Sequence, residues 1–136
     1  MKSSKTDSRQ ITLSASPFLD RNTWINENEF AVAVRDIYPV APGHTLILPK
    51  RIVSSIFDLG EHEILACWQL LGAERERLTS EFNPDGFNVG VNVGTAAGQT
   101  VGHAHIHLIP RYHGDHPAPR GGIRAVMPGK ADYEEH

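Results

Sequence analysis

Three histidines alternate within one short stretch, VGHAHIHLIPR, where they are His103, His105 and His107. Near neutral pH an imidazole can attack as a nucleophile, transfer a proton or bind a metal. Residues two apart in a strand lie on the same face, so the three imidazoles would lie opposite the apolar side chains between them. The spacing therefore predicts a strand with one core face and one histidine face.

A shared metal ion is one use for such a row. Zinc holds each imidazole nitrogen at about 2.0–2.1 Å, whereas three alternate positions of a straight strand span about 13 Å. Only two of the three could then ligate, with help from His44, His113 or an acid. A solvated, histidine-rich strand face is a second reading, although the apolar residues between the histidines indicate a core strand.

Nucleophilic catalysis at phosphorus is the third use. It needs one unprotonated imidazole, donors for the phosphate oxygens and an acid for the leaving group, and three imidazoles could divide these tasks. The preceding loop, GTAAGQTVG, offers flexible backbone N–H groups, the Thr100 hydroxyl and the Gln99 amide, which can hold an anion without net positive charge. The chain has neither a GxxxxGK[ST] nor a GxGxxG motif.

Composition indicates the class of protein in which these residues occur. The chain has 136 residues, 40% hydrophobic and 21% charged, with net charge -3, which is typical of one soluble domain rather than a basic nucleic-acid binder. The single cysteine, Cys67, excludes an intrachain disulfide. No apolar run approaches the roughly 18 residues of a membrane helix, and the N-terminal stretch is polar. We expect a flexible tail over 1–10, one domain over 11–136 and a cytoplasmic location.

Hydrophobic periodicity predicts an α+β fold in which an antiparallel sheet carries one long helix. A short helical turn is expected at Ser16–Pro17, and residues 111–136 are expected to be irregular because they are rich in glycine and proline. In the helix, the apolar face is expected to be Ile64, Trp68, Leu71, Leu78 and Phe82. The expected strands are Trp24–Asn26, Phe30–Arg35, His44–Lys50, Phe87–Gly94 and His103–Pro110, with the helix over about 60–82.

The strand over Phe87–Gly94 has an unusual outer face. Its valines and phenylalanine alternate with Asn88, Gly90, Asn92 and Gly94, so one face packs on the core and the other is small and polar. A small face leaves room for something to lie on it.

Four motifs in register resemble the histidine triad (HIT) family. HAHIHLIPR resembles its signature, YPVAPGHTLILPKR its upstream segment, and NVGTAAGQ and AGQTVGHAHIHLIPR the stretches that join them. The resemblance covers about Phe30 to Arg111. It implies a sheet of about five antiparallel strands with one long helix, a homodimer, and purine nucleotide chemistry through a nucleotidyl-histidine. It implies no nucleic-acid or membrane partner.

The resemblance also assigns the four catalytic positions. His105 matches the nucleophile, His107 the histidine beside the phosphate and leaving group, and His103 the one that supports the nucleophile through hydrogen bonds. His44 matches the upstream histidine of the same network, with a loop cap as its alternative role. We expect no resident metal and no tightly bound cofactor, although Mg²⁺ or another divalent cation could accompany a polyphosphate substrate.

Substrate-binding positions follow from the same match. Asp36 matches the ribose-binding position, where a carboxylate can accept from both hydroxyls of a diol; a turn cap is its alternative. Asn92 matches an amide at the phosphate or leaving group, with a plain strand-face amide as the alternative. Val34 and Ile37 match walls of the base pocket, or are simply core, and Phe18 and Leu19 are weaker candidates. The phosphate loop matches Gly98, Gln99, Thr100 and Val101.

Within the family the match to LIPR and the Gln-Thr pair favours a dinucleoside polyphosphate hydrolase. A phosphoramidase, a nucleotidyltransferase or phosphorylase, and a nucleotide sensor with little turnover stay open as alternatives. The basic residues Arg120, Arg124 and Lys130 lie outside the family signature. They could reach the phosphates of a longer polyphosphate, contact a second protomer or belong to a solvated tail.

Overall fold

The computed structural model describes residues 16–133, so the tail expected over 1–10 lies outside the described residues. Five strands form one sheet in the order β1-β2-β3-β5-β4, with antiparallel neighbours throughout. One long helix, α2 (Glu61–Phe82), packs against it. This confirms the expected α+β fold. The strands are β1 (Trp24–Glu27), β2 (Ala31–Arg35), β3 (Thr45–Pro49), β4 (Gly86–Val91) and β5 (Ile106–Arg111).

Short 3-10 turns connect these elements. The expected N-terminal turn is present as η1 (Pro17–Leu19), capped by the Ser16 hydroxyl, which accepts from the Phe18 N–H at 3.3 Å. Proline suits the first position of such a turn because it has no N–H to leave unpaired. The others are η2 (Arg21–Thr23), η3 (Ile56–Asp58), η4 (Thr95–Ala97) and η5 (Gly122–Val126).

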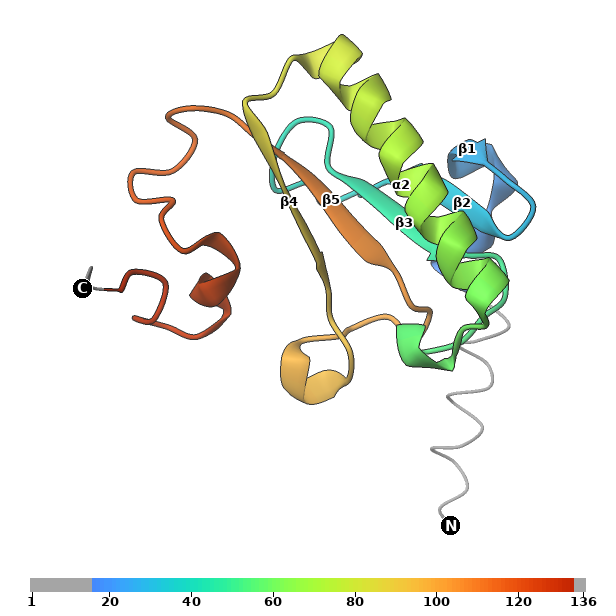
Figure 1. Cartoon of the computed structure of the whole chain (residues 1–136). Coiled ribbons are helices and arrows are strands. Elements are labelled where there is room, and N and C mark those ends of the chain that lie inside the picture. Colours follow the sequence, from blue (N-terminus) through green and yellow to red (C-terminus); the bar gives the residue numbers. More distant parts are fainter. Residues whose placement is uncertain (1–15, 134–136) are drawn as a thin grey trace.

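The sheet has two apolar faces with different coverings. Helix α2 lies across one of them (Figure 1), where the core includes Ile47, Ile106 and Leu108. The opposite face holds a second cluster, which Phe18 and Trp24 cover in part. That cluster consists of Val32, Val34, Leu46 and Leu48.

One row of side chains crosses this second face from β2 to β4. Val34 pairs with Leu46, Leu46 with His107, and His107 with Gly90. Directly paired residues point to the same face and neighbouring strands lie about 4.8 Å apart, so the row is about 14 Å long. His107 therefore lies on the face away from α2, between an apolar half over β2 and β3 and the small polar face of β4.

Helix α2 buries only part of the row that was expected. Ile64, Trp68 and Phe82 are 41%, 52% and 36% exposed. The buried row is Ala66, Cys67, Leu70, Leu71, Glu74 and Leu78. Leu71 and Leu78 are thus buried as expected, whereas Ile64, Trp68 and Phe82 are not. The centre of the buried face lies about one residue position, or 100° of rotation, from the expected one, because a glutamate occupies the middle of the true core face.

Glu74 tolerates this position because it has partners from β1, from β2 and from its own helix. Its carboxylate accepts from the Asn26 side-chain amide at 2.9 Å and from Arg77 at 3.3 Å. Arg35 lies 3.8 Å from its other oxygen. Buried charges are retained where such partners offset the cost of desolvation.

The triad strand begins later than its alternation predicts. Strand β5 starts at Ile106, so only His107 lies on it. The ladder between β3 and β5 ends at the pair Ile47–Ile106. Beyond it, the Pro49 carbonyl oxygen lies 2.7 Å from the His103 imidazole Nε2. Ala104, between the histidines, is buried as expected. The expected single strand with all three imidazoles on one face is thus wrong at its first half.

The turn from β2 to β3 brings Asp36 beside His44. The Asp36 N–H donates to the His44 carbonyl at 3.0 Å. Gly43 makes the turn with φ +89°, and a Cβ there would lie 2.9 Å from the Leu78 side chain of α2. A left-handed backbone this close to the helix requires glycine.

The C-terminal segment is mostly irregular, as expected, but it is not separate from the sheet. Its 3-10 helix, η5, contacts β4, and Ile123 lies over Gly90, where a Cβ would be 3.7 Å from it. Part of the chain itself thus occupies the space expected above the small face. Among residues 16–133 no helix is long and apolar enough to cross a membrane.

Candidate active site

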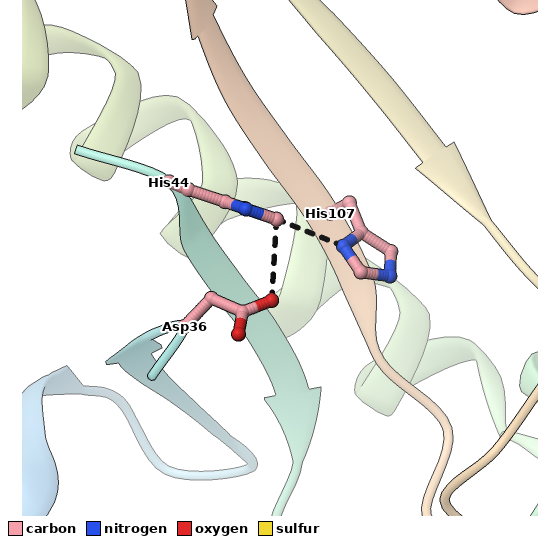
Figure 2. Close-up of side chains that lie close together, drawn as sticks. All are labelled: Asp36, His44 and His107. Carbon is pink, nitrogen blue, oxygen red and sulfur yellow. Dashed lines mark hydrogen bonds and ion pairs between the residues drawn. The ribbon is translucent and has the colours of Figure 1, made fainter. Parts of the chain in front are cut away.

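Two histidines and an aspartate meet at the ends of three strands (Figure 2). Asp36 follows β2, His44 precedes β3 and His107 lies on β5. His44 Nε2 lies 2.9 Å from His107 Nδ1 and 3.5 Å from an Asp36 carboxylate oxygen. The sheet register explains the meeting, since His107 pairs with Leu46, two residues after His44.

The partners of these rings fix where their protons lie. The backbone N–H of Val40 donates to His44 Nδ1 at 3.1 Å, so that nitrogen is unprotonated and the proton of neutral His44 is on Nε2. His44 Nε2 then donates to His107 Nδ1. The proton of neutral His107 is consequently on Nε2, which makes the outer nitrogen of His107 a hydrogen-bond donor.

His105 has the opposite arrangement. Its Nδ1 lies 2.7 Å from the backbone carbonyl oxygen of His103, which can only accept, so Nδ1 carries the proton. Its Nε2 therefore keeps a free lone pair, the requirement for a nucleophile. The ring is held between Phe18, edge-on with centroids 5.0 Å apart, and His107 at 5.1 Å.

His103 is fully buried and holds the segment of the site in place through its hydrogen bonds. Its Nε2 donates to the Pro49 carbonyl at 2.7 Å, and its Nδ1 accepts from the Ser16 hydroxyl at 2.6 Å. The imidazole thus fastens the segment, and the hydrogen bond that His105 receives comes from the His103 backbone. His103 was expected to support the nucleophile His105 through hydrogen bonds. In the structure the hydrogen bond to His105 is made by the His103 backbone carbonyl and not by its imidazole.

Burial favours the neutral form of His44, His103 and His107. It lowers the pKa of His107 to about 4, with further lowering by His105 and His44, while the Asp36 carboxylate acts in the opposite direction. Burial is also the main cause that lowers the pKa of His44 and of His103. Neutral rings at pH 7 agree with the proton positions that their hydrogen bonds require.

The loop before the triad is built around the Gln99 side chain. Its amide oxygen accepts from the Gly94 N–H at 2.8 Å, and its NH₂ donates to the carbonyls of Ser54 and Val101. Gln99 therefore shapes the loop rather than offering its amide to an anion. Within the described chain the backbone N–H groups of Thr100 and Val101 have no hydrogen-bond partner, so they are among the loop donors available to a phosphate.

Gly98 closes the η4 turn of this loop with φ +90°.

The other expected substrate contacts differ in exposure. Asp36 caps a turn through one oxygen, which accepts from the Tyr38 N–H at 2.9 Å, and directs the other toward His44. Val34 is buried in the sheet cluster and Ile37 is 79% exposed. These positions suit the floor and the rim of a nucleoside site.

Asn92 follows β4 and lines a cavity together with His44 and His107. The amide expected at the phosphate or leaving group therefore lies on the β4 side of the two imidazoles.

Asp36, His44 and His107 could also hold a metal ion, since their ligand atoms all lie within 4.8 Å of one another. Two imidazole nitrogens at 2.0–2.1 Å from a tetrahedral zinc are about 3.3 Å apart. The 2.9 Å between the rings is instead a hydrogen-bond distance. A metal would have to break this bond and displace the proton of His44.

Four contacts of the site were not predicted from the sequence. His103 contacts Ser16 and Pro49, and His44 accepts from Val40. Phe18, which was only a weak candidate for the base pocket, lies beside His105. Ser16 lies 87 residues from His103, so no local spacing could reveal it. The Val40 and Pro49 contacts use backbone atoms, which any residue type carries.

Fold and site together define a class of protein: an antiparallel α+β domain that presents a free imidazole nitrogen beside an imidazole N–H donor. The model of the HIT domain matches residues 20–114, and the chain belongs to this family, which confirms the resemblance. A bis(5'-adenosyl)-triphosphatase of Dictyostelium discoideum is 45% identical over 61% of this chain and 56% of its own length.

An AP-4-A phosphorylase of Mycobacterium tuberculosis is 35% identical over 67% of this chain and 47% of its own. The crystal structure of a HIT family protein from Bacillus anthracis matches with a TM-score of 0.65 and 40% identity, covering 68% of this chain and 66% of the other. The chain thus spans about half the length of these two curated relatives.

Proposed function

We propose that the protein is a nucleotide hydrolase that cleaves a dinucleoside polyphosphate, such as diadenosine tri- or tetraphosphate, at the α-phosphate. The observation that carries the proposal is the opposite protonation of two adjacent imidazoles. His105 has a free Nε2 lone pair, and His107 beside it has an outward N–H. Binding alone needs no such nucleophile, which disfavours a sensor with little turnover.

In the first step the His105 Nε2 lone pair forms a bond to the α-phosphorus, and the bond from phosphorus to the bridging oxygen breaks. The electrons of that bond go to the departing nucleotide. His105 keeps its Nδ1 proton and becomes a positively charged nucleotidyl-imidazolium, which the His103 carbonyl stabilises.

His107 donates a hydrogen bond from Nε2 to the phosphate or to the leaving oxygen. The negative charge of a bound polyphosphate raises the pKa of this ring, so His107 can also pass on its proton when the leaving group needs one. The free backbone N–H groups of Thr100 and Val101 bind the non-bridging oxygens.

In the second step water attacks the phosphorus and the bond from phosphorus to nitrogen breaks. The electron pair returns to His105 Nε2, and the proton of the water leaves to the solvent or to the phosphate. The ribose of the transferred nucleotide is assigned to Asp36, whose carboxylate can accept from both hydroxyls. Its base is assigned to the half of the face with Val34 and Ile37.

The test is a substrate panel: diadenosine tri- and tetraphosphate, adenosine phosphoramidate and a nucleotide sugar, each with and without inorganic phosphate. His105→Ala is expected to lose turnover on every active substrate and to keep nucleotide binding. Rapid quenching at alkaline pH, where a phosphorus–nitrogen bond survives, should show the wild-type chain heavier by one nucleoside monophosphoryl group. Full activity of His105→Ala would sink the proposal.

Phosphorolysis is the second candidate, and the AP-4-A phosphorylase among the relatives is what favours it. Inorganic phosphate then replaces water in the second step, and the product is a nucleoside diphosphate rather than a monophosphate. The same panel separates the two reactions. Preference for the phosphoramidate would point to the phosphoramidase instead.

We further propose a homodimer that forms through β4 and the adjoining apolar surface. Among the described strands β4 pairs only with β5, so its other edge is open. Beside it, Phe57 and Trp68 are 79% and 52% exposed around an apolar hollow of about 190 Å³. An open strand edge next to exposed apolar side chains can pair with a second copy across a two-fold axis.

Trp68→Glu is expected to lower the mass measured by light scattering to that of one chain. An unchanged mass would reject this interface. The cytoplasmic location stays a prediction.

A further inference from the structure

A cavity of about 350 Å³ lies on the histidine face, over the half of the sheet formed by β4 and β5. His44, His107 and Asn92 line it on one side, and Ile123 and Val126 of η5 line it on the other. Its volume falls in the lower part of the range for small-molecule sites. The cavity thus joins the catalytic imidazoles to the C-terminal segment.

Its place in the cross-strand row separates it from the site of the transferred nucleotide. Val34 and Leu46 lie on one side of His107, and Gly90 lies on the other. Asp36, assigned to the ribose, follows β2 on the first side. On the second side Ile123 lies over Gly90, so the cavity is on the side of His107 opposite the residues assigned to the transferred nucleotide.

The segment that forms the outer wall is held in a defined shape. Gly121 has φ +88°, and a Cβ there would collide with the Ala131 carbonyl oxygen. Arg124 Nε donates to the Lys130 carbonyl at 3.0 Å, and its guanidinium lies 4.9 Å from the centre of the Tyr133 ring. The closed loop from Gly121 to Tyr133 therefore carries η5 as a unit.

Arg120 pairs with Asp132 at 3.2 Å and lies against the same tyrosine ring. The two arginines therefore interact inside the segment, although they were considered as candidates to reach a polyphosphate.

The cavity walls are chemically those of a nucleobase site. Ile109 and Ile123 supply apolar surface. Asn88 Oδ1 already accepts from Arg111 at 2.6 Å, so the Asn88 NH₂ and the Asn92 amide are the groups that can pair with the polar edge of a base. Ile123 and Val126 are 57% and 75% exposed at its rim, which leaves apolar surface for a ligand to cover.

We propose that this cavity binds the leaving-group nucleoside of the dinucleotide, and that Ile123 and Val126 determine specificity for it. The inference rests on the proposed function, because it places the second half of the same substrate. On this proposal, η5 and the small face of β4 make the protein bind a dinucleotide more tightly than a mononucleoside polyphosphate.

Diadenosine triphosphate and ATP form the matched ligand pair, since both have three phosphates and only the first has a second adenosine. Their affinities are measured by calorimetry on His105→Ala, which is expected not to cleave either ligand, with Ile123→Ala, Val126→Ala or Met127→Ala added. Met127 follows η5, is 60% exposed and does not line the cavity, so it is the control.

Ile123→Ala and Val126→Ala are each expected to weaken diadenosine triphosphate roughly tenfold and to leave ATP unchanged, while Met127→Ala changes neither. Equal weakening of both ligands would show that the transferred nucleotide occupies the cavity and would overturn the proposal. No change with either ligand would overturn it as well.

Failure of the proposed function would give a different result from failure of the cavity proposal. A wild-type protein that binds both ligands but cleaves no substrate of the panel refutes the hydrolase. The affinity pattern still decides the cavity in that case. Binding of neither ligand would overturn both proposals.

Discussion

Acid should destabilise the protein through His107, because the fold lowers the pKa of this ring from 6.5 to about 4. In the unfolded chain His107 binds a proton below pH 6.5, whereas in the folded chain it stays neutral until about pH 4. Between these values the unfolded state binds more protons, so stability is lost as the pH falls. Above pH 6.5 both states are neutral and the ring adds no pH dependence.

The size follows from about 1.36 kcal/mol per pKa unit. With pKa values of 6.5 and about 4, the loss due to His107 is about 1.4 kcal/mol at pH 5.5 and about 2.5 kcal/mol at pH 4.5. The groups that face the ring are His105 and His44, which lower its pKa, and Asp36, which raises it.

The assay is urea unfolding of the wild type and His107→Gln at pH 7.5, 5.5 and 4.5. Glutamine can still accept from His44 and cannot titrate, so the stability difference between the two proteins should shift toward the variant by the amounts above. His113→Gln is the control, since the His113 side chain is 92% exposed. A difference that is independent of pH, or a His107 pKa near 6.5 by NMR, would refute the reasoning.

Three further outcomes are expected. Ser16→Ala should lower the free energy of unfolding by about 1–3 kcal/mol, because it leaves Nδ1 of the buried His103 without a donor, and urea titration measures it; no loss would mean that water replaces the hydroxyl. Gly43→Ala should cost about 1–3 kcal/mol, since its φ is +89° and its Cβ would lie 2.9 Å from a side chain of α2. Gly72→Ala is its control, because it lies inside α2 with nothing within 4 Å of its Cβ, and should stabilise by about 0.5–1 kcal/mol. Asp36→Asn should raise KM for a ribonucleotide more than for its 2',3'-dideoxy analogue, and equal effects in steady-state kinetics would exclude a ribose contact.

The sheet and the long helix could be predicted from the sequence because local patterns determine them. Alternation marked the strands, and Asn83, with φ 51°, ends α2 in the expected turn. The helix face was misplaced because a single buried glutamate, Glu74, contradicts the rule that core positions are apolar. Its partners, Asn26 and Arg35, come from other elements and have no local signature.

The histidines could be located but not distinguished by spacing. Alternation places His103, His105 and His107 on equal terms, whereas each ring has a different partner in the fold: a hydroxyl and a carbonyl for the first, a backbone carbonyl for the second, another imidazole for the third. The partners of His103 and His107 come from the N-cap of η1, from β3 and from the turn between β2 and β3, which only the tertiary structure brings together. The partner of His105 is local, since it is the His103 carbonyl two residues earlier.

Those partners turn three identical side chains into three chemical groups. A carbonyl on His105 Nδ1 leaves Nε2 as a lone pair, and a donor on His107 Nδ1 makes Nε2 a proton carrier. Exchange of the two partners would exchange the two roles without any change in the triad itself. The reactivity of the site is therefore set by what the backbone and His44 present to the inner nitrogens, and a variant that leaves the triad intact can still abolish it.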